Sequence, residues 1–308
     1  MTTLILHHYD GSPFSEKVRL VFGLKGLAWR SVKVPVMLPK PDVMALTGGY
    51  RRTPFLQLGA DVYCDSALMC RVIDQLAPAP PLYPAEAGPL QHIVAQWADS
   101  ALFWCAIPYT MQPAGIVQIF AGAPPEFLKA FGADRAAMTA GRTRVTSADA
   151  AAQLASFFGW LEALLGDDRR YLLGAAACIA DFSVAQSIWF IRRAPAVATV
   201  LAPFPHLLAW YERVAAFGHG HVEPMTAEQA IAVSAASPVH APTSVDANGG
   251  FASGTAVTVT PTDYAADPVA GALVGLGVDE VVIERHDDRA GRVHVHFPRI
   301  GFQIKAQA

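Results

Sequence analysis

The first eighty residues combine short apolar runs with two stretches of helical periodicity. Residues 4–8 form an apolar run that is typical of a buried strand. From Pro13 to Leu24 the apolar side chains recur at helical spacing. Ser12 directly before Pro13 predicts an N-cap followed by a proline in the first helical turn. This part of the chain therefore predicts a strand that leads into a helix beginning beside Ser12.

The pattern continues with a second strand and then a hairpin. Strands are expected at 30–34, 55–58 and 62–64, with a proline-punctuated loop after the first of them. Asp65 is expected to cap a helix that runs to Ala77. The order is β-α-β followed by β-β-α. A parallel half followed by an antiparallel half is the pattern of the thioredoxin fold.

Residues 84–218 show helical periodicity only, which predicts a compact helical bundle. The expected helices are 89–106, 125–131, 134–144, 148–165, 181–193 and 205–216.

The pattern changes again near the C-terminus. Residues 237–254 are small, polar and rich in proline and glycine, as in a linker. Beyond them apolar and polar residues alternate with the period of a strand, which predicts a β-unit of three or four short antiparallel strands. The fold class is thus a multidomain α+β protein. The expected domains are 1–83, 84–236 and 237–308, and removal of 238–308 is expected to leave a folded two-domain core.

Composition narrows the class of protein. The chain has 308 residues, of which 53% are hydrophobic and 16% charged, enough for two or three domains with sizeable cores. The net charge of −3 does not favour a nucleic-acid partner or an electrostatic membrane partner. No apolar run reaches the roughly eighteen residues of a membrane span, and the first residues do not resemble a signal peptide. We therefore expect a cytoplasmic protein without a membrane partner.

The four cysteines do not form a metal-binding or redox motif. No two of them form a C-x-x-C pair, and their spacing fits no zinc module; they are Cys64, Cys70, Cys105 and Cys178. Small buried thiols in a reducing compartment are the expectation.

Three segments carry the candidate chemistry. The helix that begins beside Ser12 offers amide groups and a hydroxyl that stabilise an anion such as a thiolate. The Thr53-Pro54 step favours a cis peptide that exposes the backbone of Thr53. The helix start at Asp65-Ser66 offers donors to a carboxylate, and Asp65 can pair with an ammonium. Together they would hold a peptide-like thiol that has an amine and a carboxylate at one end.

These segments resemble a known family. SPFSEKVRL (12–20), RRTPFLQL (51–58), CDSALM (64–69) and CIADFSVA (178–185) are similar to the glutathione transferases, in that order, over roughly the first 220 residues. The resemblance implies glutathione as co-substrate, Ser12 as the residue that activates its sulfur, and a role in detoxification. It further implies Thr53 and Pro54 at the cysteinyl part, Asp65 and Ser66 at the γ-glutamyl end, and Arg52 and Lys40 at the glycine carboxylate.

Two departures accompany this resemblance. Some members use a tyrosine at the end of the first strand, and Tyr9 lies close to that place, so Tyr9 is the alternative thiol activator. The family usually has Ser or Thr where this chain has Cys178, so Asp181 is expected to carry more of the helix capping. Ser12 stands where thiol-transferase members have a cysteine, which argues against that chemistry.

The function follows as three hypotheses. The first is a glutathione transferase-like enzyme, a homodimer by resemblance, that activates the glutathione thiol for attack on a small electrophile. Tyr109 is the preferred candidate for the electrophile pocket, because it lies at a helix break. The second is a non-catalytic relative that binds a ligand or a protein, and the third is a glutathione-dependent isomerase or dehalogenase.

Histidines suggest a metal in three places, and we assign no metal ligand in any of them. His7 and His8 are adjacent in a strand and point to opposite faces. The segment around His219 and His221 is expected to be a solvated turn. His294 and His296 share one strand face, with His286 expected across from them, and a polar sheet face explains this group better than a metal site.

Overall fold

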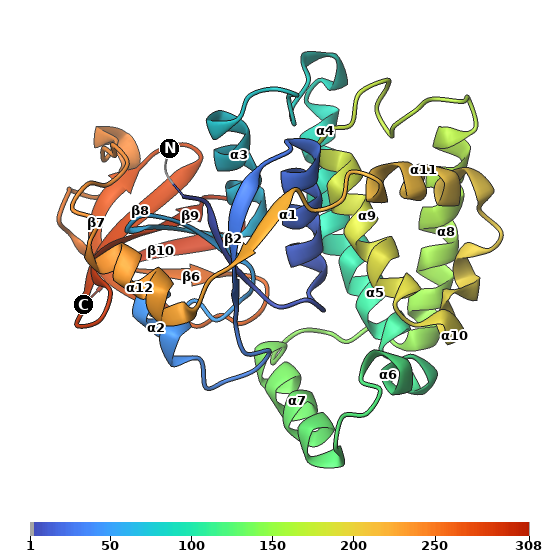
Figure 1. Cartoon of the computed structure of the whole chain (residues 1–308), viewed down its shortest axis with the longest axis horizontal. Coiled ribbons are helices and arrows are strands. Elements are labelled where there is room, and N and C mark those ends of the chain that lie inside the picture. The colour runs from blue at the N-terminus through green and yellow to red at the C-terminus, as the bar shows by residue number, and fades with distance from the viewer. Residues whose placement is uncertain (1–2, 308) are drawn as a thin grey trace.

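Figure 1 shows the computed structural model of the chain, which describes residues 3–307 as a long mixed β-sheet with helices on both faces and a helical bundle at one side. The strands pair in the order β10-β6-β7-β8-β9-β4-β3-β1-β2-β5. Their bounds are β1 Ile5–His8, β2 Ala28–Lys33, β3 Phe55–Leu58, β4 Asp61–Cys64, β5 His221–Pro224, β6 Ala256–Pro261, β7 Val269–Leu276, β8 Glu280–Asp287, β9 Gly291–Pro298 and β10 Phe302–Ala306.

The helices fall into those that cover the sheet and those of the bundle. Helices α1 Pro13–Leu24, α2 Pro41–Thr47, α3 Ser66–Leu76 and α12 Ala227–Ala235 lie along the sheet. The others are α4 Leu90–Trp97, α5 Phe103–Thr110, α6 Pro113–Ile119, α7 Pro125–Met138, α8 Ser147–Leu165, α9 Ile179–Arg192, α10 Pro195–Ala198 and α11 Pro205–Ala215.

Strands β1 to β4 and helices α1 and α3 form the thioredoxin-like arrangement that the sequence predicts. Strand β1 pairs parallel with β2 and antiparallel with β3, and β3 pairs antiparallel with β4. Helix α1 begins as expected: the Ser12 side chain accepts a hydrogen bond from the backbone N–H of Ser15 at 3.2 Å. The strand-to-helix step at Ser12 is therefore fixed by local hydrogen bonding.

The C-terminal strands continue this same sheet. Strand β9 pairs parallel with β4, and β6 to β10 pair antiparallel with one another. The unit has five strands rather than the three or four expected. The strand not expected is β7 (VAGALVGL), whose alanines and glycines obscure the period of two.

A second hydrophobic core lies under this extension and includes residues of the thioredoxin-like part. Phe55, Val62 and Cys64 are fully buried in one cluster with residues of α2 and of the C-terminal strands. Alternate residues such as Leu56 face the first core, which continues into the bundle. The C-terminal unit and the N-terminal sheet therefore bury their apolar surfaces together.

Residues 221–224 also join the sheet, which corrects the expectation of a solvated turn at His221. Strand β5 pairs parallel with β2, and its register places His221 opposite Ala28. Helix α12 follows, and its Ala230 carbonyl accepts a hydrogen bond from the Gln57 side chain at 2.8 Å. His221 begins a strand because the edge of β2 supplies its partner, whereas His219 lies in a turn as expected.

The helical bundle differs from the predicted helices at several places. Helices α6 and α10 were not expected, and the helix expected at 134–144 ends at Met138. Two further differences concern α7 and α5. Helix α7 is one helix where two were expected, because Gly132 does not interrupt it. Helix α5 extends through Pro108 to Thr110, whose hydroxyl donates to the Ala106 carbonyl at 2.7 Å. Both differences affect the rim of the cavity described below.

The predicted capping role of Asp181 in α9 is confirmed. Its carboxylate accepts hydrogen bonds from the backbone N–H groups of Cys178 and Leu172 at 2.8 and 2.9 Å, and from the Trp210 indole at 2.8 Å. All four cysteines are buried, as expected. Between residues 3 and 307, no helix combines the length and apolar character that crossing a bilayer requires.

Candidate active site

A cavity of about 750 Å³ opens between the β1–α1 turn and helices α5, α6 and α7. Five of the predicted site residues line it, namely Tyr9, Ser12, Lys40, Arg52 and Thr53. Pro54, Asp65, Ser66 and Tyr109 are not in its lining. The structure therefore gathers the thiol-side and carboxylate-side candidates in one hollow and sets the γ-glutamyl candidates apart from it.

Ser12 lies where the cavity meets the first turn of α1. Ser12 is 2% exposed, and its Oγ lies 3.3 Å from the Thr53 carbonyl, to which it donates. The Thr53–Pro54 peptide is cis, as expected. A ligand sulfur at this point would meet the Ser12 hydroxyl and the positive end of α1, both of which favour a thiolate.

Tyr9 also faces the cavity, from the end of β1, and is half-buried. Its place three residues before Ser12 keeps it within the same wall, because the Ser12 N–H donates to the Tyr9 carbonyl at 3.2 Å. The geometry therefore brings both candidate thiol activators to the same place.

Lys40 supplies a buried cation beside Thr53. Its Nζ donates to the Arg51 carbonyl at 3.1 Å and to the Thr53 hydroxyl at 3.3 Å. Burial, together with the nearby Arg135 and Arg51, lowers the pKa of Lys40 to about 8. Its charge is therefore present at neutral pH and lost in mildly alkaline solution.

Arg52 is engaged by the C-terminal unit. Its guanidinium donates to the Asp263 carboxylate and to the Tyr264 carbonyl, and stacks 3.8 Å from the centre of the Tyr264 ring. Both partners belong to the loop between β6 and β7. A glycine carboxylate at Arg52 would thus compete with Asp263.

Asp65 and Ser66 form the start of α3. The Asp65 carboxylate accepts from the Ala67 N–H at 2.9 Å, and the Ser66 hydroxyl accepts from the Lys17 ammonium at 3.3 Å. Burial raises the pKa of Asp65 above its usual range. Burial, with the nearby charges of Asp263 and Asp65, raises the pKa of Tyr264 to about 12.

Tyr264 is a cavity residue that the sequence does not mark. Its ring meets Trp104 edge to face at 5.1 Å between centroids, and the next residue, Ala265, donates its N–H to the Met138 carbonyl at 2.7 Å. The loop thus docks on α5 and α7. No signal in the local sequence places it there, since its position follows from the pairing of β9 with β4.

The far wall of the cavity is aromatic. Phe103, Trp104, Phe120, Phe127 and Phe131 line it, and the Phe120 and Phe131 rings are 4.8 Å apart. Tyr109, the preferred pocket candidate of the sequence analysis, instead packs against the first core and donates its hydroxyl to the Val197 carbonyl at 2.9 Å.

Cationic side chains surround this aromatic wall. Arg135, Arg142, Arg144 and Arg193 line the cavity, whereas Asp10 is the acidic residue of its lining. The Arg142 guanidinium lies 4.1 Å from the Trp104 ring, and Arg193 donates to the Gly11 carbonyl at 3.0 Å. The cavity therefore combines a large apolar surface with positive charge.

His7 and His8 are buried, and each ring has a hydrogen-bond partner. His7 bonds the Gln57 side chain at 2.8 Å, and His8 bonds the Ser31 hydroxyl at 2.8 Å. Burial lowers the pKa of His7 to about 4, so its ring is neutral at neutral pH. The two rings have separate partners, as their places on opposite strand faces predict.

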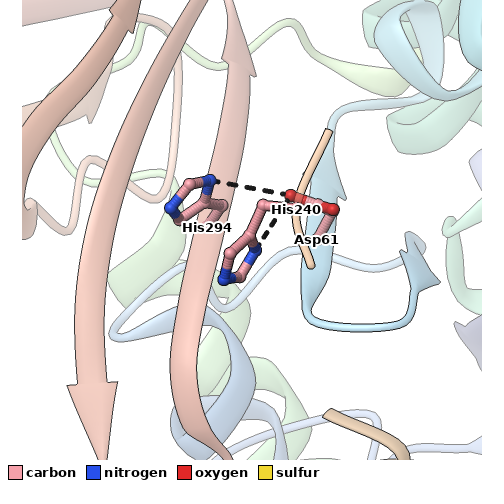
Figure 2. A group of neighbouring side chains, drawn as sticks. All are labelled: Asp61, His240 and His294. Carbon is pink, nitrogen blue, oxygen red and sulfur yellow. Dashed lines mark hydrogen bonds and ion pairs between the residues drawn. The ribbon is translucent and has the colours of Figure 1, made fainter. Parts of the chain in front are cut away.

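The third histidine group differs from the expected one. His286 pairs across from Arg292 and is exposed, whereas His294 pairs with Glu284. The side chains gathered near His294 are Asp61 of β4 and His240 of the segment after α12 (Figure 2). This grouping depends on the β4–β9 pairing, which sequence reasoning did not foresee.

Comparisons with known proteins identify the family. Residues 6–81 match the glutathione S-transferase N-terminal domain, and residues 135–213 match the glutathione S-transferase C-terminal domain. A GST-like protein from Pseudomonas syringae is 39% identical, with 100% of both chains covered and a TM-score of 0.81. The chain belongs to the glutathione S-transferase family. This family membership agrees with the fold class expected from the sequence.

More distant structures share the fold. A glutathione S-transferase from Rhodospirillum rubrum F11 is 19% identical, with 69% of this chain and 88% of that chain covered and a TM-score of 0.54. Rice GST1 in complex with glutathione is 20% identical, with 70% and 86% covered and a TM-score of 0.50. Among curated proteins, none matches this glutathione S-transferase family member significantly.

Proposed function

We propose that this protein is a glutathione transferase that activates the glutathione thiol at Ser12 for attack on an electrophile held in the adjacent cavity. The observation that carries the proposal is the buried Ser12 hydroxyl at the N-terminus of α1, in the wall of a cavity large enough for both reactants. Lys40 and Arg52 would hold the glycine carboxylate, and Thr53 would pair its backbone with the cysteinyl part.

The reaction requires little from the protein beyond electrostatics. The thiol proton leaves to solvent, the thiolate attacks the electrophilic carbon, and the halide or other leaving group departs as an anion. A free thiol has a pKa near 8.5, and lowering it by about two units takes about 2.7 kcal/mol. One hydrogen bond to a charged group contributes roughly 1.5–3 kcal/mol, and the helix dipole adds to it.

The first test is retention on immobilised glutathione followed by an assay with a reactive aromatic halide. We expect retention and turnover, and we expect Ser12→Ala to lose most of the turnover. The Tyr9→Phe variant is the matched comparison. If Ser12→Ala remains active and Tyr9→Phe does not, Tyr9 is the thiol activator.

The cavity favours a bulky aromatic electrophile that carries a negative charge. The aromatic wall supplies apolar contact, and Arg142 and Arg144 supply cations beyond those near Lys40. A chloronitrobenzoate and its methyl ester share the reacting carbon, but the ester has a methyl group in place of the charge. We expect a higher kcat/KM for the acid, and we expect Arg142→Gln to lower it by about tenfold for the acid alone, the loss of about 1.4 kcal/mol. Arg170→Gln, outside the cavity, is the control.

Two observations favour a binding protein without turnover. Asp263 and Tyr264 occupy Arg52, and Asp65 and Ser66 lie outside the cavity lining. Retention on glutathione without turnover of any electrophile would favour this alternative. A panel of halide and isomerisable substrates separates a transferase from an isomerase or dehalogenase. The homodimer and the cytoplasmic location remain predictions.

A further inference from the structure

A cluster of buried polar side chains lies outside the cavity, where the C-terminal strands join the N-terminal sheet. Asp61 begins β4, His294 belongs to β9, and His240 belongs to the irregular segment after α12 (Figure 2). We call these three residues the Asp61 cluster. The side chains of His240 and Asp61 are each 7% exposed and that of His294 10%. Three segments distant in sequence therefore bring nitrogen and oxygen donors together in the interior.

The donor spacing suits a small divalent cation. The Asp61 Oδ1 atom lies 3.3 Å from His240 Nδ1 and 3.8 Å from His294 Nδ1, and one donor atom of each residue lies within 4.8 Å of the others. In a tetrahedral zinc site with bonds of about 2.0–2.1 Å, neighbouring ligand atoms are about 3.3 Å apart. The His240–Asp61 distance matches that separation, and the His294–Asp61 distance exceeds it by about half an ångström.

The hydrogen bonds of His294 direct a lone pair toward Asp61. Its Nε2 lies 3.1 Å from the Glu284 carboxylate and donates to it, so Nδ1 carries the free lone pair of a neutral ring. Nδ1 is buried without a hydrogen-bond partner and faces the Asp61 oxygen. Two acceptors that face each other repel unless a cation lies between them. A carboxylate behind a histidine is also the usual support of a metal-bound imidazole.

His240 completes the donor set from the other side. Its Nε2 is buried without a partner, and its ring stacks on that of His294 with the centroids 3.6 Å apart. The nitrogen lone pairs of stacked rings lie in two parallel planes, so one ring must turn before both can bind the same ion. His240 stands outside any helix or strand, so neither a helix nor a strand ladder fixes its backbone.

The surroundings hold the carboxylate in place and are acidic. Asp61 accepts from the Ala241 N–H at 2.9 Å and contacts His296 Nε2 at 3.0 Å. His296 Nδ1 bonds Glu280 at 2.6 Å, while the Arg292 guanidinium approaches Glu284 at 3.7 Å. The three carboxylates outnumber the basic side chains of His296 and Arg292, which favours an added positive charge.

We propose that Asp61, His240 and His294 bind one zinc-class divalent cation that fastens the C-terminal strands to the N-terminal sheet. Two imidazoles and one carboxylate are ligands that zinc prefers, and water would complete its shell. The cation would bind the folded chain and not the unfolded one, so it would raise stability rather than take part in the glutathione reaction.

The test uses the tag-free full-length protein, stripped with a chelator and titrated with Zn²⁺ by calorimetry and with Co²⁺ by visible absorption. We expect one equivalent to bind, a tetrahedral Co²⁺ spectrum, and a higher melting temperature with Zn²⁺. His240→Ala and His294→Ala should abolish all three effects, and Glu284→Gln should weaken binding by about 10- to 100-fold. His286→Ala, exposed on the neighbouring strand, is the control that should bind like the unchanged protein.

The proposal is overturned if the stripped protein binds less than one equivalent, or if His240→Ala binds as well as the unchanged chain. His240 stands on an irregular segment, so its variant tests the site even where His294→Ala fails to fold. Circular dichroism of each variant separates loss of ligand from loss of fold.

Discussion

Ser12 has two hydrogen-bond partners in the structure, and the weaker one is the one that a sulfur would replace. The N–H of Ser15 donates to its oxygen at 3.2 Å, while its own proton points to the Thr53 carbonyl over 3.3 Å. The first bond fixes the oxygen at the start of α1. The second is long for an O–H donor, so redirecting the proton toward a thiolate gives up little.

The pKa of Lys40 predicts how glutathione binding depends on pH. Its pKa near 8 means that its charge disappears as the pH rises through about 8. S-methylglutathione has no thiol to titrate, so its affinity should fall above that pH if Lys40 holds the glycine carboxylate. Calorimetry from about pH 7 to pH 9.5 measures this.

The matched control is Lys40→Arg, which keeps its charge throughout this range. The ligand's own amine titrates alike with both proteins, so the difference between the two curves isolates Lys40. Equal pH dependence in the two proteins would contradict the role of Lys40. The effect of pH on folding has the opposite direction to its effect on ligand binding. Because the pKa of Lys40 is lower in the folded chain, the free energy of unfolding rises between about pH 8 and the unfolded pKa near 10.4.

Residues near the first helix could be predicted from the sequence because local rules decide their positions. Ser12 precedes a proline at a helix start, and Thr53 precedes Pro54, so both signals lie within a few residues of the site they mark. Tyr264 could not be predicted in this way. It reaches Arg52 only because of strand pairings some two hundred residues apart in sequence.

Among the elements, α9 depends on one carboxylate. Asp181→Ala would leave two backbone N–H groups and the Trp210 indole buried without their acceptor. Each unpaired donor costs about 1–3 kcal/mol, so we expect a loss of at least about 3 kcal/mol in the free energy of unfolding. Urea denaturation measures this loss.

The control is Asp149→Ala, in the exposed first turn of α8, which should lower the free energy of unfolding by less than about 1 kcal/mol. Equal losses in both variants would contradict the account.

The loop between β6 and β7 gives a prediction about the cavity. Asp263 pairs with Arg52, so it competes with any ligand carboxylate for that guanidinium. Asp263→Ala should therefore raise the affinity for glutathione, measured by calorimetry. Asp267→Ala, in the same loop, is the control. Unchanged or weaker glutathione binding by Asp263→Ala would show that Arg52 does not hold the ligand.

At the scale of the whole molecule, the C-terminal strands form part of the main sheet. From the sequence alone, the chain without residues 238–308 is expected to remain folded. The structure changes this expectation, since that truncation uncovers β4 along its length and exposes Phe55, Val62 and Cys64, which are now fully buried. We expect the truncated chain to lose its cooperative thermal transition or to aggregate. A soluble truncated protein with an unchanged melting temperature would contradict the shared core.

Fold class could be predicted because strand and helix periods are local properties, whereas the ten-stranded sheet could not. The linker-like composition of 237–254 favours a separate unit, yet the edge of β4 pairs with β9 and buries the apolar face of both parts. Local composition indicates which segments resemble a linker. It does not indicate which strands pair in the folded chain.

The central claim is that a glutathione sulfur bound beside Ser12 ionises more readily than it does in water. The most direct measurement is the ultraviolet absorbance of the bound thiolate, titrated against pH with the unchanged protein and with Ser12→Ala. We predict a bound thiol pKa about two units below the free value near 8.5, and a return most of the way to that value in Ser12→Ala. A bound thiol that titrates like free glutathione, or a lowered pKa that Ser12→Ala leaves in place, would contradict the account.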